Sequence, residues 1–277
     1  MFGPLAPFFI HDKRTSMLSY QHAYHAGCPA DVHKHAVLAR LLLRLASQDD
    51  PITLIETHAG RGLYDLRSVE SKKTGEAIQG IVRLLNDGKL PRTHPLFKVI
   101  AATRREHGPS AYPGSPLLAH ALLRAKDQIH LMEMHPQEFA ALDELLGHEA
   151  NVSIQDAEGF AATMRLVPPT PPRGLVLIDP SYEVKTEYSQ TAHFVLDLHD
   201  KWREGIIMLW YPLLKAGNHE VMVEGLEHAN LKGFHRREML FAKREDVRGM
   251  HGSGLILVNL PDAFVPVLDA FDWPYRF

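Results

Sequence analysis

The chain has 277 residues, 45% hydrophobic and 23% charged, which is enough for one large α/β domain or two small ones. Its net charge of -3 excludes a uniformly basic surface, so any contact with nucleic acid must come from a local patch. The single cysteine, Cys28, excludes an intrachain disulfide and is typical of a reducing cytoplasm. No apolar run approaches the roughly 18 residues that a transmembrane helix needs.

Residues 1–16 are predicted to form a loose amino-terminal extension. Their apolar patch, Phe8-Phe9-Ile10, is too short for the core of a signal peptide and lacks a basic start. The main domain is expected to begin at Met17. Residues 31–46 carry apolar side chains at helical spacing, which predicts a helix with Asp31 as its cap.

The rest of the chain alternates predicted strands with predicted helices. Strands are expected at residues 52–56, 129–134, 152–155, 175–178, 206–210, 237–242 and 255–260, and helices at 115–126, 136–147, 157–166, 187–203 and 216–230. This alternation favours an α/β fold with a seven-stranded, mostly parallel sheet covered on both faces. The last two strands follow each other without a helix, which predicts an antiparallel edge.

Residues 63–114 interrupt the alternation and contain no predicted strand. Ten Lys/Arg stand against five Asp/Glu between positions 61 and 110, so this segment carries about +5 in a chain of net charge -3. It is predicted to be a helical insertion between the first and second strands of the sheet. Its charge indicates either a solvated helical face or a surface for a phosphate backbone.

The most informative motif is Asp179-Pro180-Ser181-Tyr182, directly after the apolar run at residues 174–178. Open α/β sheets bind ligands at the carboxyl ends of their strands. The Asp179 carboxylate and the Pro180 carbonyl can accept the two hydrogens of an exocyclic amine, and Tyr182 can stack on a flat base. Asp-Pro is also a common turn, so the motif alone indicates either a strand end or an active site.

Three other strand ends have features of an adenosine site. Gly60 and Gly62 follow the first strand and let the backbone approach a ligand closely. Glu133 ends the next strand, where a carboxylate can accept hydrogen bonds from ribose hydroxyls, and Glu158 and Gly159 follow the third. No G-x-x-x-x-G-K loop is present to cradle a pyrophosphate. The pattern therefore favours S-adenosylmethionine as the cofactor.

Other kinds of site are not supported by the sequence. The eighteen histidines predict no metal site, because His33 and His35 are two apart and would face different ways on a helix. Ser115 lacks the G-x-S-x-G elbow of a serine hydrolase, and a helix N-cap is its simplest role. Trp210 and Tyr211 are expected in the core, with Tyr211 as the candidate for a pocket wall.

Several separated blocks match a known family in order and spacing. They are Met17-Leu18-Ser19-Tyr20 with His22, His25-Ala26-Gly27, Ala30-Asp31-Val32, Lys34-His35, Thr57-His58-Ala59-Gly60, Thr74-Gly75-Glu76, Tyr112-Pro113-Gly114-Ser115-Pro116, Glu133 with His135-Pro136, Leu209-Trp210-Tyr211-Pro212, and Arg248-Gly249-Met250 with Ser253-Gly254. Over residues 17–261 the chain resembles the bacterial 23S ribosomal RNA adenine-N6 methyltransferase family, ribosomal RNA large subunit methyltransferase J. Its members were earlier described as proteins involved in the catabolism of external DNA.

The resemblance implies a Rossmann-like, S-adenosylmethionine-dependent methyltransferase domain over residues 17–277, with the insertion at about 63–114. The cofactor contacts it implies are His35, His58, Ser115, Glu133, Glu158 and Gly159. It implies that Asp179 is the catalytic acceptor. It also implies that Tyr20, His22 and Lys34 belong to an amino-terminal segment that closes over cofactor and substrate.

Two positions depart from the family pattern. The family usually has Asp at the position of Glu158, and Asp-Pro-Pro-Tyr where this chain has Ser181. Ser181 removes a second ring and its fixed backbone angle. We expect activity to survive this change, with its effect falling on the precision of the loop and on the rate.

The implied function is N6-methylation of a specific adenine in 23S ribosomal RNA by a cytoplasmic monomer. The RNA is expected to be free of protein or at an early stage of assembly, since the base must leave its stack to react. Two alternatives stay open at this point. One is a DNA adenine methyltransferase, and the other is a non-catalytic nucleic-acid-binding protein that supports the use of external DNA.

Overall fold

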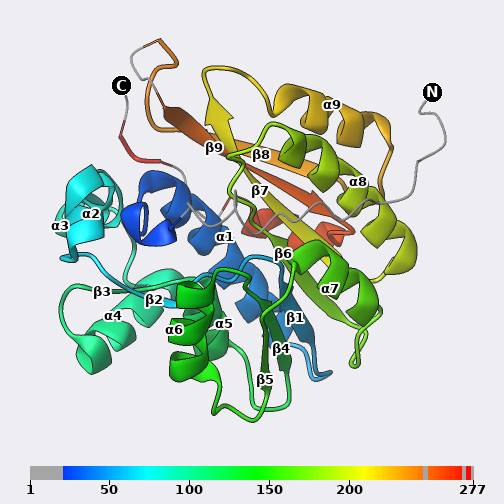
Figure 1. The fold of residues 1–277 in the computed structure, drawn as a ribbon, viewed down its shortest axis with the longest axis horizontal. Coiled ribbons are helices and arrows are strands. Elements are labelled where there is room, and N and C mark those ends of the chain that lie inside the picture. Colours follow the sequence, from blue (N-terminus) through cyan, green and yellow to red (C-terminus); the bar gives the residue numbers. More distant parts are fainter. Residues whose placement is uncertain (1–20, 246–248, 270–272, 276–277) are drawn as a thin grey trace.

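The computed structural model describes residues 21–245, 249–269 and 273–275. A seven-stranded sheet runs through the centre of the molecule, with helices on both of its faces (Figure 1). Its strands are β1 (Thr53–Glu56), β4 (Gln128–Met132), β5 (Val152–Gln155), β6 (Gly174–Ile178), β7 (Ile206–Leu214), β8 (His235–Leu240) and β9 (Met250–Val258). The predicted α/β class and the number of strands in this sheet are confirmed.

The strand order is β5-β4-β1-β6-β7-β9-β8. Every pairing from β5 to β7 is parallel, whereas β9 pairs antiparallel with both β7 and β8. The predicted antiparallel pairing of the last two strands is therefore confirmed, but the antiparallel strand β9 lies inside the sheet and β8 forms the edge. Residues 251–258 of β9 are all buried, whereas most of β8 is not, so the apolar strand takes the interior position.

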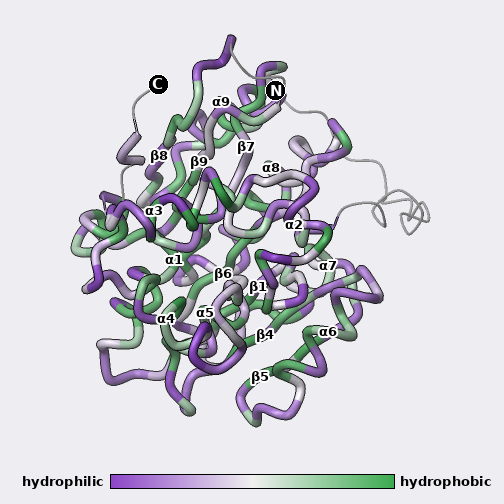
Figure 2. The backbone as a smooth tube through the Cα atoms, turned by 90° about the vertical axis from the view of Figure 1, so that its left-hand side faces the viewer, coloured by the Kyte–Doolittle hydropathy of each residue, from purple (hydrophilic) through white to green (hydrophobic). Residues whose placement is uncertain are grey.

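The core has two layers, one on each face of the sheet. Side chains alternate along β6, so that Leu175 and Leu177 enter one layer while Val176 and Ile178 enter the other. The first layer is covered by α1 (Pro29–Ala46), α4 (Pro95–His107), α5 (Ser115–Leu122), α6 (Pro136–Leu146) and the 3-10 helix η5 (Asp262–Val267), and the second by α7 (Gly159–Leu166), α8 (Thr186–Lys201) and α9 (Glu220–His228). In Figure 2 hydrophobic residues concentrate along the central strands, and hydrophilic residues along the outer turns.

The insertion lies between β1 and β4, as predicted. Besides α4, it contains the short helices α2 (Val69–Thr74), η4 (Ile78–Val82) and α3 (Arg83–Asn86). The prediction that it has no strand is wrong, because β2 (Leu63–Asp65) and β3 (Ala111–Pro113) pair antiparallel and close it at its base. Three residues are too few to show the alternation of a strand in the sequence.

No helix within the described ranges combines the length and the apolarity that crossing a bilayer requires.

Candidate active site

A pocket of about 260 Å³ opens at the carboxyl ends of the parallel strands. The loops after β1, β4, β5 and β6 line it, together with the start of α1, the 3-10 helix η3 (His22–Tyr24) and part of β7. It gathers twelve candidates from the sequence: His22, Lys34, His35, His58, Gly60, Ser115, Glu133, Glu158, Gly159, Asp179, Pro180 and Tyr182. Tyr20 and the expected extension at residues 1–16 lie outside the described residues.

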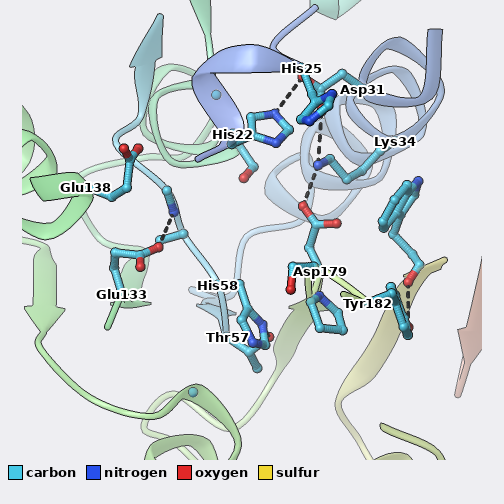
Figure 3. Close-up of a pocket in the computed structure, with 18 of the residues that line it drawn as sticks. His22, His25, Asp31, Lys34, Thr57, His58, Glu133, Glu138, Asp179 and Tyr182 are labelled. Atoms are coloured by element: carbon cyan, nitrogen blue, oxygen red, sulfur yellow. Dashed lines mark hydrogen bonds and ion pairs between the residues drawn. The ribbon is translucent and has the colours of Figure 1, made fainter. Parts of the chain in front are cut away.

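Asp179 follows β6, and its carboxylate pairs with the ammonium group of Lys34 (Figure 3). Lys34 Nζ also lies 3.1 Å from Asp31 Oδ1. The Lys34 and Asp179 side chains are only 4% and 14% exposed. Burial alone would lower the pKa of Lys34, but the two carboxylates raise it above its ordinary value. Lys34 is thus a fixed positive charge within α1, whereas the family resemblance implied that it belongs to the amino-terminal segment that closes over cofactor and substrate.

Asp31 is not the cap of α1, as the sequence suggested, but a residue of its first turn. The N-cap is Cys28, whose Sγ accepts a hydrogen bond from the Asp31 N–H at 3.4 Å. The Asp31 carboxylate accepts one from the Gly27 N–H at 2.9 Å and lies 2.9 Å from His22 Nε2. Burial would raise the pKa of Asp31, but His22 and Lys34 hold it well below its usual range. Asp31 therefore connects η3 to the Lys34–Asp179 pair.

Tyr182 is held in a strained backbone conformation beside the pocket. Its φ of 55° lies in the left-handed region, which non-glycine residues seldom occupy. Its hydroxyl donates to the Trp210 carbonyl at 3.0 Å, and its ring stacks on Tyr188 with 4.4 Å between centroids. One face of the ring is therefore covered, and the side chain is 5% exposed. The half-buried Ser181 beside it also lines the pocket.

Trp210 and Tyr211 have exchanged their expected places. Trp210 lines the pocket, whereas Tyr211 is fully buried and its hydroxyl donates to Glu238 Oε1 at 2.8 Å. The predicted strand ended at residue 210, but β7 continues to Leu214. Successive residues of a strand face opposite ways, so only one of the two rings can reach the pocket.

Two buried side chains fix the orientation of Trp210. Its indole N–H donates to Ser253 Oγ at 2.8 Å, and Ser253 Oγ lies 3.0 Å from His33 Nδ1. The Ser253 hydroxyl can accept from the indole and still donate to His33 Nδ1, because it has one donor and two acceptor sites. Burial lowers the pKa of His33 to about 4, so its imidazole is neutral and can accept this bond.

Glu133 is oriented by two backbone groups. Its Oε2 accepts from the Gly60 N–H at 2.8 Å, and its Oε1 from the His135 N–H at 2.7 Å. Gly60 has a φ of 65°, in the left-handed region that favours glycine. Burial raises the pKa of Glu133 above its ordinary value. Each carboxylate oxygen keeps a lone pair for a further donor such as a sugar hydroxyl.

Ser115 is tied to the buried carboxyl group of Glu56, the last residue of β1. Ser115 is the first residue of α5 and Gly114 is the N-cap, so Ser115 does not cap the helix. Its hydroxyl donates to Glu56 Oε2 at 2.7 Å, while Glu56 Oε1 has no hydrogen-bond partner among the described residues. Burial raises the pKa of Glu56 to about 8, so this group is mostly protonated at neutral pH.

The two histidines that were predicted to contact the cofactor have different surroundings. His35 lies within α1 with Nδ1 at 2.9 Å from the Tyr112 hydroxyl, and burial lowers its pKa to about 3. His58 is half-buried in the loop after β1, with Nδ1 at 2.8 Å from Thr57 Oγ1. His35 is therefore neutral and fixed, whereas His58 is the more accessible of the two.

Glu158 and Gly159 begin α7 at the pocket. The Glu158 carboxylate caps this helix and accepts from the Phe160 and Ala161 N–H groups at 3.3 and 2.8 Å. A Cβ on Gly159 would lie 1.9 Å from the Thr57 carbonyl oxygen. Only glycine lets the start of α7 approach the residue after β1 this closely. The backbone at Glu158, the N-cap of α7, is therefore fixed in position.

The charge of the pocket decides which cofactors fit. Among the described residues that line it, Lys34 is the only Lys or Arg, and it is already paired with two carboxylates. A pyrophosphate would find no free cation here, whereas ribose hydroxyls would find the acceptors of Glu133. The residues therefore fit an adenosyl group without phosphates. No cluster of three His, Cys, Asp or Glu suited to a metal ion occurs in the described ranges.

A family model described as "Ribosomal RNA large subunit methyltransferase D, RlmJ" matches residues 49–272. The chain belongs to this family. It is 35% identical over 246 residues to Ribosomal RNA large subunit methyltransferase J of Escherichia coli (strain K12), a match that covers 88% of each chain. The protein of the same name from Haemophilus influenzae is 35% identical over 247 residues, again covering 88% of each chain.

A solved structure has the same fold over most of its length. The crystal structure of a Legionella pneumophila protein has a TM-score of 0.80 and 33% sequence identity, and the match covers 89% of this chain and 91% of that one. The family resemblance inferred from the sequence blocks is confirmed. The chain is a Rossmann-like methyltransferase that uses S-adenosylmethionine.

Proposed function

We propose that the protein transfers the methyl group of S-adenosylmethionine to the N6 amine of an adenine in 23S ribosomal RNA. The observation that carries this proposal is the Asp179-Pro180 turn, which shares one pocket with Glu133 and the Gly60 loop. On this proposal the acceptor for the exocyclic amine lies beside the acceptors for the adenosyl group. The names of the two relatives at 35% identity support a ribosomal RNA substrate.

The cofactor supplies an electrophilic methyl group, and the residues of this chain hold it in place. We assign Glu133, supported by the Gly60 N–H, to the ribose hydroxyls. The remaining contacts are assigned to His35, His58, Ser115, Glu158 and Gly159, which line the same pocket. Glu158 keeps unused lone pairs while it caps α7, so it can serve the helix and a ligand together.

The Asp179-Pro180 turn activates the amine. Its nitrogen is a weak nucleophile, because the lone pair is delocalised into the ring. Hydrogen bonds to the Asp179 carboxylate and the Pro180 carbonyl orient the amine and direct its lone pair toward the methyl group. Positive charge develops on nitrogen during transfer, and the Asp179 carboxylate stabilises it. The proton then leaves to Asp179 or to water.

Lys34 must share Asp179 with the incoming amine. It contacts Asp179 Oδ2, which leaves Oδ1 for the amine. Asp31 holds the same ammonium group at 3.1 Å, so Lys34 keeps a partner even if it moves away from Asp179. We assign Lys34 the role of holding the Asp179 carboxylate in place until the base arrives.

The target base needs an aromatic surface on which to stack. Tyr182 offers the part of its ring that Tyr188 leaves open, and Trp210 offers a ring fixed by Ser253. Base–aromatic stacking contributes about 1–3 kcal/mol per base. We assign Tyr182 and Trp210 to the base, with Tyr20 and His22 in the amino-terminal segment that covers it.

We assign every contact with the cofactor and the target base to residues of one chain. We propose a monomer in which residues 17–277 form one methyltransferase domain with its insertion at about 63–114. We also propose that the RNA is free of protein or at an early stage of assembly. A base that must leave its stack is easier to extract before ribosomal proteins cover it.

The test is to incubate the protein and labelled S-adenosylmethionine with protein-free 23S ribosomal RNA from a strain that lacks the gene. Genomic DNA from the same strain is treated in parallel, and the modified base is mapped. We expect label at N6 of one adenine in the RNA. Label in DNA alone would make the protein a DNA methyltransferase. Binding of nucleic acid with no transfer would make it a non-catalytic protein.

A further inference from the structure

We propose that Lys72 and Lys73, here called the α2 lysine pair, form the surface on which the RNA backbone docks beside the target base. This inference rests on the proposed function, since it assumes an RNA substrate, and adds the place where that substrate is held. Both lysines are exposed and lie at the end of α2 in the insertion.

Several cations of the insertion are already engaged within the protein. Arg61 forms two hydrogen bonds with the Glu138 carboxylate, at 2.8 and 2.5 Å. The Arg83 guanidinium lies 3.6 Å from the centroid of the Tyr275 ring and 3.8 Å from Asp87. Groups held in this way cannot turn toward a phosphate without losing their partners.

The other cations form no ion pair with any described carboxylate. They are Arg67, Lys72, Lys73, Lys89, Arg92, Lys98, Arg105 and Arg104, the last of which donates a hydrogen bond to the Ala111 carbonyl. Their position relative to the pocket decides which of them can meet RNA bound at the active site.

The end of α2 packs against η3, which lines the pocket. Lys73 Nζ lies 5.5 Å from the centroid of the Tyr24 ring, and the Thr74 hydroxyl donates to the Tyr24 carbonyl. Glu76 lies 3.0 Å from His25 Nδ1, and His25 lines the pocket. The α2 lysine pair therefore stands beside the mouth of the pocket. Unlike Arg83, Lys73 forms no ion pair with a described carboxylate, so its ammonium group keeps donors for a phosphate while it lies over the Tyr24 ring.

The cations of α4 occupy a different place. Lys98 and Arg105 are exposed on a helix whose buried side packs in the first core layer, and no residue of α4 lines the pocket. Figure 1 shows α2 and α4 at separate ends of the insertion. Lys98 and Arg105 carry the same charge as the α2 lysine pair and lie in the same insertion, so replacing them provides a matched control for position.

An RNA that places one base in this pocket must keep its backbone at the mouth on both sides of that nucleotide. Phosphate contacts of this kind fix the register of the RNA without reading its sequence. Lysines suit the task, because each is a point charge on a flexible stem. A chain of net charge -3 needs such a local patch to bind a polyanion at all.

The test compares Lys72→Gln/Lys73→Gln with Lys98→Gln/Arg105→Gln in the full chain. Binding of a 23S ribosomal RNA fragment is measured by fluorescence anisotropy over a range of salt concentrations, and binding of S-adenosylmethionine by calorimetry. For the α2 variant we expect about tenfold weaker RNA binding and a salt slope reduced by about 1.4, from the loss of two contacts with single-stranded RNA. The rise in KM should exceed the change in kcat, and cofactor affinity should match the wild type.

Three results would overturn this inference. Equal losses in both variants would show that only total charge matters, and unchanged binding in the α2 variant would place the RNA elsewhere. Loss of cofactor affinity in the α2 variant would show that the lysines support the fold of the pocket. A wild-type protein that methylates no RNA would instead refute the proposed function, and this inference with it, so the two failures are distinguishable.

Discussion

The ammonium group of Lys34 and the carboxylate of Asp179 form an ion pair between residues 145 positions apart in the sequence. The pair joins α1 to the carboxyl end of β6, and Asp31 extends it to His22 at 2.9 Å. A helix near the amino terminus is thereby aligned with the Asp-Pro turn. The contact therefore links the stability of the fold to Asp179, the residue that we propose as the acceptor of the amine.

Replacing Lys34 tests this link. Lys34→Met removes the cation between two carboxylates and leaves Asp31 and Asp179 buried without it. We expect the free energy of unfolding to fall by about 3–5 kcal/mol. The single-turnover rate of methyl transfer should also fall, because Asp179 loses the partner that holds its carboxylate in place. Urea unfolding and single-turnover rates measure the two effects.

Lys98→Met is the control, since Lys98 is exposed on α4 and forms no ion pair with a described residue. Its free energy of unfolding should stay within about 0.5 kcal/mol of the wild type. Equal stability of the two variants would mean that the Lys34–Asp179 contact contributes nothing.

Glu56 makes stability depend on pH in a defined direction. Burial raises its pKa from 4.5 to about 8, so the folded state holds a proton that the unfolded state releases. Its contribution to stability is complete below about pH 4.5 and is lost as the pH rises toward about 8. Glu56→Gln removes this dependence and keeps an acceptor for Ser115.

We therefore expect Glu56→Gln to gain stability relative to the wild type as the pH rises, by on the order of 2–4 kcal/mol between about pH 5 and about pH 8. Urea titrations of both proteins across this range provide the difference, in which other titrating groups cancel. Parallel stability curves would show that Glu56 is ionised in the folded protein.

Replacement by alanine should have opposite effects on the stability of the fold at Gly159 and at Gly225. A Cβ on Gly159 would lie 1.9 Å from the Thr57 carbonyl oxygen, so Gly159→Ala must push α7 away from β1. Gly225 lies within α9 with nothing within 4 Å of the added atom, so Gly225→Ala should stabilise by about 0.5–1 kcal/mol. Thermal unfolding and S-adenosylmethionine affinity distinguish them, and an intact cofactor affinity in Gly159→Ala would remove Gly159 from the site.

Much of the fold could be predicted because the sheet is so deeply buried. Strands such as β6 carry continuous apolar runs, and the residues that follow them meet at one edge whatever the detailed packing. For this reason Gly60 and Asp179, although distant in sequence, could both be predicted to belong to one site, and both line the pocket. The glycines and carboxylates there are required by local chemistry, which the sequence shows directly.

The errors arose where tertiary packing decides. Which of Trp210 and Tyr211 faces the pocket can be predicted only if β7 is known to continue past residue 210, and no residue type marks where the strand ends. The position of β9 inside the sheet depends on pairing with two partners distant in sequence. Asp31 connects Lys34 to His22, and this role depends on both contacts. A helix cap can be predicted from the residues of one helix, but these contacts cannot.

The most direct test of the central claim is the Asp179→Ala variant, measured by single-turnover methyl transfer from labelled S-adenosylmethionine to 23S ribosomal RNA. Removing the amine acceptor should lower the rate by about 1000-fold or more, while cofactor affinity stays within about threefold, because Lys34 keeps its contact with Asp31. A variant that binds the cofactor and still methylates at a rate near that of the wild type would contradict the assignment of Asp179.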